Sequence, residues 1–269
     1  ARVVASFHAA EEPVINPRAA GADALGENWA DNFAVTDALV DAGVDAVDLD
    51  RVKTLTQTYL RGRRPLFDER IADGFVRDGH GDLIADDVFC LVDDGPQIID
   101  CLAFNDDWRI GDVLLDIAFL VMDVHRVAGP AAALRLLGWY QGFSGECHPS
   151  SLAHHYVAYR AHVRAKVACL RAAQGHLDES ARAALRADHA RHLALAHSQL
   201  EPQRPAIVID RGQRREGLEQ PKRHGGELAC HHQNAHGDHH RACAHVERPP
   251  PAPQRPDASS ARSGTDQPT

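Results

Sequence analysis

The sequence predicts a mostly helical α+β fold, and three observations support this prediction. Several long stretches carry apolar residues three or four positions apart, the spacing that buries one face of an α-helix. Two short apolar runs, residues 88–92 and 97–102, flank an Asp-Gly turn and indicate a β-hairpin. After about residue 202 the periodic apolar residues vanish, so we expect the ordered part to end there.

The helices follow from apolar periodicity and from residues that stop it. Pro13 ends the first periodic stretch, and Gly129-Pro130 ends the most apolar one, which begins at Val113. Asp112 precedes that stretch, where a carboxylate can accept the free backbone N–H groups of a helix start. Residues 105–111 are expected to form a loop. The predicted helices span residues 1–12, 25–39, 49–73, 113–128, 131–143, 152–173 and 178–200.

Composition divides the chain into a helical lobe, residues 1–201, and a tail, residues 202–269. Arg, Gln, His, Gly and Pro dominate the tail, which is typical of disordered, low-complexity sequence. The abrupt change would also suit a frame-shifted C-terminus. A zinc site is an alternative, but the tail has no Cys-x-x-Cys pair and few apolar residues around its candidate ligands. These ligands are Cys230, His231, His232, His236, His239, His240, Cys243 and His245.

The bulk properties exclude some classes of protein. The chain has 269 residues, of which 44% are hydrophobic, and its formal net charge is -9. A nucleic-acid-binding protein would need a basic surplus, so we expect no nucleic-acid partner. No apolar run approaches the ~20 residues that span a bilayer, and the first residues are too polar for an export signal. We therefore expect a cytoplasmic protein with no membrane partner.

The candidate chemistry lies in the DGHGDL sequence at residues 78–83, called here the acidic loop, and in the hairpin that follows it. The loop carries His80 and Asp82, and Asp87 lies just before the first strand of the hairpin. The second strand would return Asp100 towards the loop. Three carboxylates and a histidine on one unit could hold a divalent ion and act on a hydroxyl group. Alone, Asp82 could equally be a residue that caps a turn.

Five ordered motifs extend this pattern over residues 1–200. They are DGHGDL at 78–83, DVF at 87–89, IDCLAFN at 99–105, GDVLLDIAF at 111–119 and YRAHVRAKV at 159–167. Together they resemble the aminoglycoside phosphotransferase family, in the branch often fused to a C-terminal P-loop kinase-like domain. The resemblance implies a protein-kinase-like C-terminal helical lobe that carries a catalytic-loop β-hairpin. It further implies transfer of the γ-phosphate of ATP, with Mg²⁺, to a hydroxyl of a small aminoglycoside- or sugar-like molecule.

The resemblance assigns a role to each residue of the candidate site. Asp82 would be the catalytic base, and His80 would complete the catalytic pair by bracing the acidic loop. Asp87 and Asp100 would bind Mg²⁺.

Two acidic residues of the following helix complete this assignment. Asp112 and Asp116 match the family motif that supports the catalytic loop, so their expected role is structural.

The sequence departs from the family pattern at both ends. Residues 1–75 contain no Gly-rich loop on a hairpin and no strand lysine, the parts that grip ATP phosphates, so the N-terminal lobe is missing. A longer or a separate chain would have to supply it. The apolar run at residues 206–209 resembles the strand before a phosphate-binding loop, but no Gly-Lys-Ser/Thr follows it.

The sequence is therefore compatible with three functions. The first is a phosphotransferase, which would be inactive if the N-terminal lobe is absent. The second is a residual pseudokinase lobe that acts as a non-enzymatic binding module. The third, ranked last, is a metal-buffering protein that acts through its His-rich tail.

Overall fold

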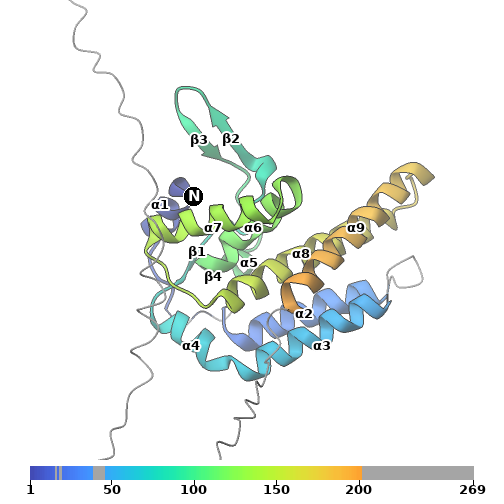
Figure 1. Cartoon of the computed structure of the whole chain (residues 1–269), viewed down its shortest axis with the longest axis horizontal. Coiled ribbons are helices and arrows are strands. Elements are labelled where there is room, and N and C mark those ends of the chain that lie inside the picture. The colour runs from blue at the N-terminus through green and yellow to red at the C-terminus, as the bar shows by residue number, and fades with distance from the viewer. Residues whose placement is uncertain (16, 18–19, 39–45, 202–269) are drawn as a thin grey trace, which may run out of the picture.

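The computed structural model describes residues 1–15, 17, 20–38 and 46–201. The predicted tail, residues 202–269, lies outside the described residues, as do its candidate zinc ligands. Figure 1 shows a helical body from which one β-hairpin projects. The helices are α1 (Arg2–Ala10), α2 (Ala22–Asp37), α3 (Ala46–Gly62), α4 (Arg64–Ala72), α5 (Asp106–Arg109), α6 (Val113–Ala128), α7 (Pro130–Ser144), α8 (Ser150–Ala172) and α9 (Glu179–Leu200).

Two antiparallel strand pairs complete the described fold, which is α+β and mostly α, as predicted. Strands β2 (Val88–Leu91) and β3 (Gly95–Ile98) form the hairpin. Strands β1 (Val76–Asp78) and β4 (Ile110–Asp112) pair with Val76 opposite Asp112. The second pair joins the segment before the acidic loop to the start of α6.

The observed strands correct two expectations. The second strand of the hairpin was expected at residues 97–102, but β3 begins at Gly95 and ends at Ile98. Gly95 has a φ of 73°, so the chain turns before Pro96, which the edge of a two-stranded sheet tolerates. The expected loop at residues 105–111 contains α5 and β4 instead. Strand β4 exists because β1 pairs with it, and this long-range partner leaves no local pattern.

Helix α6 is the centre of the core. Residues 113–123 are buried except for the half-buried Leu115, whereas the last turn is exposed, and the helix packs against both α7 and α8. Asp112 caps it as predicted, because its side chain accepts a hydrogen bond from the N–H of Leu114 at 2.9 Å. At the other end Gly129, with a φ of 84°, stops the helix at the predicted break. Helix α6 is therefore a fixed base for the segment that precedes it.

Helices α2, α3, α8 and α9 form the other part of the body (Figure 1). Trp29 of α2 is buried between Phe33 and Tyr159 and donates a hydrogen bond from its indole N–H to His155 at 3.3 Å. His162 packs against Trp29 and Phe33, with ring centroids 5.3 and 4.8 Å away. Two histidines of α8 thus lie in an aromatic core.

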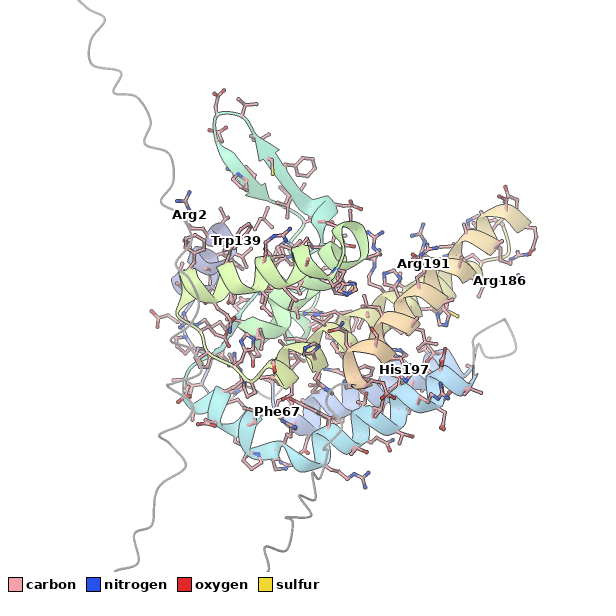
Figure 2. The ribbon with its side chains drawn as sticks, in the orientation of Figure 1. Arg2, Phe67, Trp139, Arg186, Arg191 and His197 are labelled. Carbon is pink, nitrogen blue, oxygen red and sulfur yellow. The ribbon has the colours of Figure 1, made fainter. Side chains whose placement is uncertain are left out.

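Polar side chains cover the outside of this part. Arg186 and Arg191 extend from the outer face of α9 (Figure 2).

Among the described residues, no helix combines the length and the apolar character needed to cross a bilayer.

The buried histidines predict a stability that falls in acid. Burial lowers the pKa of both His155 and His162 to about 3. Because an unfolded histidine titrates near 6.5, the unfolded chain binds more protons below that pH, so stability is complete above about pH 6.5 and is lost towards pH 3. Each histidine should cost about 2 kcal/mol of unfolding free energy between pH 6.5 and pH 5.

Urea unfolding at pH 7 and pH 5 measures this loss. His162→Leu should reduce this loss by about 2 kcal/mol, whereas the matched change His176→Leu, at an exposed position, should leave it unchanged. Equal stability of the unaltered protein at the two pH values would contradict the burial of neutral histidines.

Candidate functional site

The acidic loop is held beside the N-terminus of α6 by the β1–β4 pair. Strand β1 ends at Asp78, the first residue of the loop, and β4 ends at Asp112, the N-cap of α6. The pairing extends past the strands at both ends, because Val113 donates its N–H to Phe75 and Gly79 donates its N–H to Arg109, each at 3.0 Å. The loop is therefore fixed in register against α6.

Asp116, on the first turn of α6, clamps the loop backbone. One of its oxygens accepts the N–H of His80 and the other accepts the N–H of Gly81, both at 2.8 Å. Burial alone would raise the pKa of Asp116, but the hydrogen bond and charge of His8, the charge of Arg160 and the N–H of His80 outweigh it and lower this pKa. The carboxylate is therefore ionised and acts as an acceptor.

Asp116 can lie close to the acidic loop because position 79 is a glycine. A Cβ atom at position 79 would lie 3.1 Å from the carboxyl group of Asp116 and 3.2 Å from the carbonyl oxygen of Arg109. A side chain at this position would therefore displace the Asp116 carboxyl group or the backbone at Arg109 by a few tenths of an ångström. Gly81 is constrained in both ways, since its φ of 83° favours glycine and a Cβ atom there would lie 3.1 Å from the Cβ atom of Leu102.

His80 joins the acidic loop to the segment after β3. The side chain is buried, and its Nε2 lies 2.9 Å from the carbonyl oxygen of Ile99, to which it donates. The carbonyl oxygen of His80 accepts the N–H of Leu102 at 3.0 Å. These two bonds flank Asp100 and bring it towards the loop. The other ring nitrogen, Nδ1, is buried without a hydrogen-bond partner among the described residues.

The three candidate carboxylates occupy one electrostatic neighbourhood. Burial, followed by the negative charges of Asp100 and Asp82, raises the pKa of Asp87, while the nearby His80 opposes this shift. Asp82 and Asp87 are half-buried, and Asp100 is exposed. Each of the three can therefore be reached by a cation that would relieve the repulsion among them.

Asp100 has an unusual backbone. Its φ of 64° makes it the positive-φ residue other than glycine in the described part of the chain. Aspartate tolerates this left-handed conformation better than most residues, but the conformation still stores strain, and such strain often occurs at ligand sites. The bonds that His80 makes on either side hold Asp100 in it.

Asp87 and Asp100 are the residues that could hold a magnesium ion at this site. Mg²⁺ is usually bound through one or two protein carboxylates, and phosphate oxygens and water complete its coordination. Asp87 and Asp100 supply two such carboxylates. Among the described residues no group of three or more His, Cys, Asp or Glu side chains is placed to hold a metal by itself.

Arg109 ties the segment after Asp100 back to the loop. Its guanidinium group forms an ion pair with Asp78, with one N–H bond at 3.0 Å, and donates to the carbonyl oxygen of Leu102 at 3.0 Å. The residues between Asp100 and β4 therefore pack on the acidic loop.

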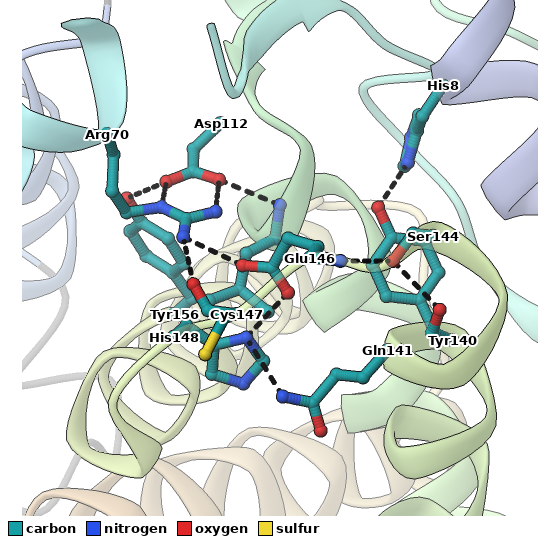
Figure 3. Close-up of polar contacts among 11 residues, drawn as sticks. His8, Arg70, Asp112, Tyr140, Gln141, Ser144, Glu146, Cys147, His148 and Tyr156 are labelled. Carbon is teal, nitrogen blue, oxygen red and sulfur yellow. Dashed lines mark hydrogen bonds and ion pairs between the residues drawn. The ribbon is translucent and has the colours of Figure 1, made fainter. Parts of the chain in front are cut away.

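A buried ionic network supports the base of α6 (Figure 3). Arg70 of α4 forms a two-pronged ion pair with Asp112, one bond of which measures 2.7 Å, and also contacts Glu146 at 2.7 Å. Tyr156 donates its hydroxyl to Asp112 at 3.1 Å. Burial would lower the pKa of Arg70, but Asp112 and Glu146 outweigh it and keep the guanidinium cationic. The network places the N-terminus of α6, and with it Asp116.

Most residues that support the acidic loop and the start of α6 could not be predicted from the sequence. Arg70 gave a weak signal, because it lies within the predicted helix at residues 49–73, next to Ile71 on its apolar stripe. Glu146 and His8 gave none, since their partners are distant in sequence.

Large apolar side chains are exposed around the candidate site. They lie on the hairpin and on the segment that follows it. They are Phe89, Leu91, Val92, Ile99, Phe104 and Trp108.

A separate cavity of about 720 Å³ lies between α2 and α3 and reaches the start of α4. Trp29, Phe33 and Leu60 supply apolar walls, and Arg61 and Arg64 lie among the polar residues that line it. None of its lining residues belongs to the acidic loop, the hairpin or α6.

The chain is similar in sequence to longer proteins. The chain is 38% identical over 178 residues to an uncharacterized protein of Mycobacterium bovis, and equally to uncharacterized proteins of two Mycobacterium tuberculosis strains. The match covers 66% of this chain and 34% of each relative, so the chain spans about a third of the relatives' length. No family model matches the chain, and no solved structure matches it at a significant level.

The buried network predicts a large cost for losing its cation. Arg70→Met would leave Asp112 and Glu146 buried without their partner, which should lower the unfolding free energy by about 3–5 kcal/mol. The matched change Arg191→Met breaks an exposed pair with Asp188 and should cost less than about 1 kcal/mol. Chemical denaturation of both variants measures the difference, and similar costs would show that the network contributes little.

The close contact at Gly79 predicts a local disruption. Gly79→Ala should displace the acidic loop and speed hydrogen exchange at the amides of His80 and Gly81. Gly138→Ala, within α7, meets no atom within 4 Å and should instead stabilise the protein by up to about 1 kcal/mol. Unchanged exchange of the loop in Gly79→Ala would contradict the described approach of Asp116.

Proposed function

We propose that this chain is the helical lobe of a kinase-like phosphotransferase that acts on a hydroxyl group of a small molecule. One observation carries the proposal: a loop with Asp82, clamped by Asp116, shares an electrostatic neighbourhood with Asp87 and Asp100. Phosphoryl transfer needs this combination, namely a carboxylate to orient the hydroxyl and further carboxylates for the metal. The five motifs that resemble the aminoglycoside phosphotransferase family support the same chemistry.

The roles follow from the positions of the side chains. Asp82, half-buried at the end of the clamped loop, would accept the proton of the acceptor hydroxyl. Asp87 and Asp100 would hold Mg²⁺, which supplies charge neutralisation to the phosphates of ATP when bound. His80 fixes the distance between these groups through its bonds on either side of Asp100.

The proposal includes a second lobe that covers the hairpin. The exposed apolar side chains of the hairpin, such as Phe89 and Val92, support this part, because contiguous exposed apolar surface often marks an interaction site. The relatives are about three times as long as the matched segment, so they have length enough for such a lobe. It would supply the groups that grip the ATP phosphates.

The second candidate is a non-enzymatic binding lobe. It is favoured by the sequence of residues 1–75, which lacks a Gly-rich loop and a strand lysine. In this case the acidic loop would retain its conformation without turning over a substrate.

Binding of Mg²⁺ and ATP separates the two candidates. A ligand at ten times its Kd stabilises a protein by about 1.4 kcal/mol, which should raise Tm by roughly 3 °C or more. We expect this rise with MgATP, and we expect Asp100→Asn to remove it. Asp50→Asn, at an exposed position of α3, is the matched control and should keep the rise.

A phosphotransfer assay with labelled ATP and a panel of amino sugars and polyols tests the role of Asp82. Asp82→Asn should keep the MgATP-dependent rise in Tm and lose at least about 100-fold in turnover. Equal turnover by the variant would exclude Asp82 as the base. The absence of any MgATP effect on the unaltered protein would favour the binding lobe.

A further inference from the structure

His8 of α1 connects three helices at the back of the acidic loop. The side chain is only 3% exposed. Its Nε2 lies 3.0 Å from a carboxylate oxygen of Asp116 on α6, and its Nδ1 lies 2.8 Å from the hydroxyl of Tyr140 on α7. Figure 3 shows His8 and Tyr140 facing each other across this contact. A buried histidine with both nitrogens engaged is fixed in orientation.

The partners of His8 indicate which of its two ring nitrogens carries a hydrogen. Asp116 is ionised and can only accept, so the Nε2 of His8 carries a hydrogen and donates it. Burial raises the pKa of Tyr140, with further contributions from Glu146 and Asp112, so the phenol keeps its proton. In the neutral imidazole whose hydrogen is on Nε2, the Nδ1 atom accepts from the Tyr140 hydroxyl, so this bond favours the tautomer that serves Asp116. A histidine oriented through its second nitrogen is a common support in active sites.

Asp116 consequently receives three donors from two directions. His80 and Gly81 donate their backbone N–H groups from the acidic loop, and His8 donates its Nε2–H from α1 to the oxygen that also accepts from His80. These three hydrogen bonds together restrict rotation of the carboxylate. Removing His8 would leave each oxygen with one donor from the loop and would remove the donor that joins the carboxylate to α1, which weakens its fixed orientation.

A second connection ties the same part of α1 to the loop. Arg77, in the middle of β1 and one residue before the loop, donates to the carbonyl oxygen of His8 at 2.9 Å and to that of Glu11 at 2.7 Å. The C-terminal turn of α1 is therefore joined to the acidic loop both through Arg77 and through Asp116.

We propose that His8 is a positioning residue and that α1 sets the conformation of the acidic loop through it. A partner or a lobe that shifts α1 would thereby alter the placement of Asp82. The consequence for catalysis rests on the proposed function, whereas the coupling of α1 to the loop does not. His8 touches no substrate atom in this account, since it acts through Asp116.

Hydrogen exchange of the backbone amides of His80 and Gly81, followed by NMR without nucleotide, tests the proposal. His8→Phe removes both hydrogen bonds and should speed exchange of these amides at least tenfold. Tyr140→Phe removes only the hydroxyl and should give a smaller increase. His8→Gln keeps an amide donor near the position of Nε2 and should restore most of the protection.

His155→Phe is the matched control, because it replaces a buried histidine of the aromatic core that has no bond to Asp116. It should leave the two loop amides unchanged. Unchanged exchange in His8→Phe and Tyr140→Phe would overturn the proposal, and so would equal effects of His8→Phe and His155→Phe. If His8→Phe does not fold, the Tyr140→Phe and His8→Gln results decide.

Hydrogen exchange of the loop amides tests the coupling of α1 to the acidic loop independently of the proposed phosphotransferase activity. Faster loop exchange in His8→Phe, together with no MgATP effect on the unaltered protein, would keep the coupling and reject the phosphotransferase. If the protein is active, His8→Phe should lower kcat with little change in KM for ATP, and His8→Gln should recover most of kcat. A loss of kcat that His8→Gln does not recover would contradict the positioning role.

Discussion

The candidate site depends on one buried carboxylate, that of Asp116, which accepts the backbone N–H groups of His80 and Gly81. A loop with two glycines has many conformations in isolation, so it needs such a clamp to present Asp82 in one direction. The carboxylate itself is held by the helix on which it lies, and the first three turns of that helix are almost entirely buried. Stability of the core and geometry of the site are therefore linked through α6.

Buried charge is concentrated behind the site rather than within it. Arg70, Asp112 and Glu146 are each about 5% exposed or less, and such ions are costly to bury. Replacement by apolar residues could pack equally well, but it would remove the directional bonds that set the start of α6. Polar networks of this kind specify one arrangement of a core when all their members are satisfied. Here that arrangement places Asp116 under the acidic loop.

The sequence predicted the parts of the fold whose causes are local. Helix α6 could be placed because its apolar run, its Asp112 cap and its Gly129 end are neighbours along the chain. The three carboxylates could be named because they occur in a fixed order around a hairpin. Strand β4 and His8 could not be predicted, since pairing with β1 and the bond to Asp116 join residues far apart. The left-handed backbone of Asp100 also leaves no mark in the sequence, because aspartate is common in ordinary turns.

Paramagnetic relaxation by Mn²⁺, a substitute for Mg²⁺, tests the central claim most directly. We expect substoichiometric Mn²⁺ to broaden the backbone NMR signals of Asp82, Asp87 and Asp100 together, while signals from α9 stay sharp. This result requires that the clamped loop and the residues on either side of the hairpin face one ion. Broadening of only one of the three, or of none, would contradict the account.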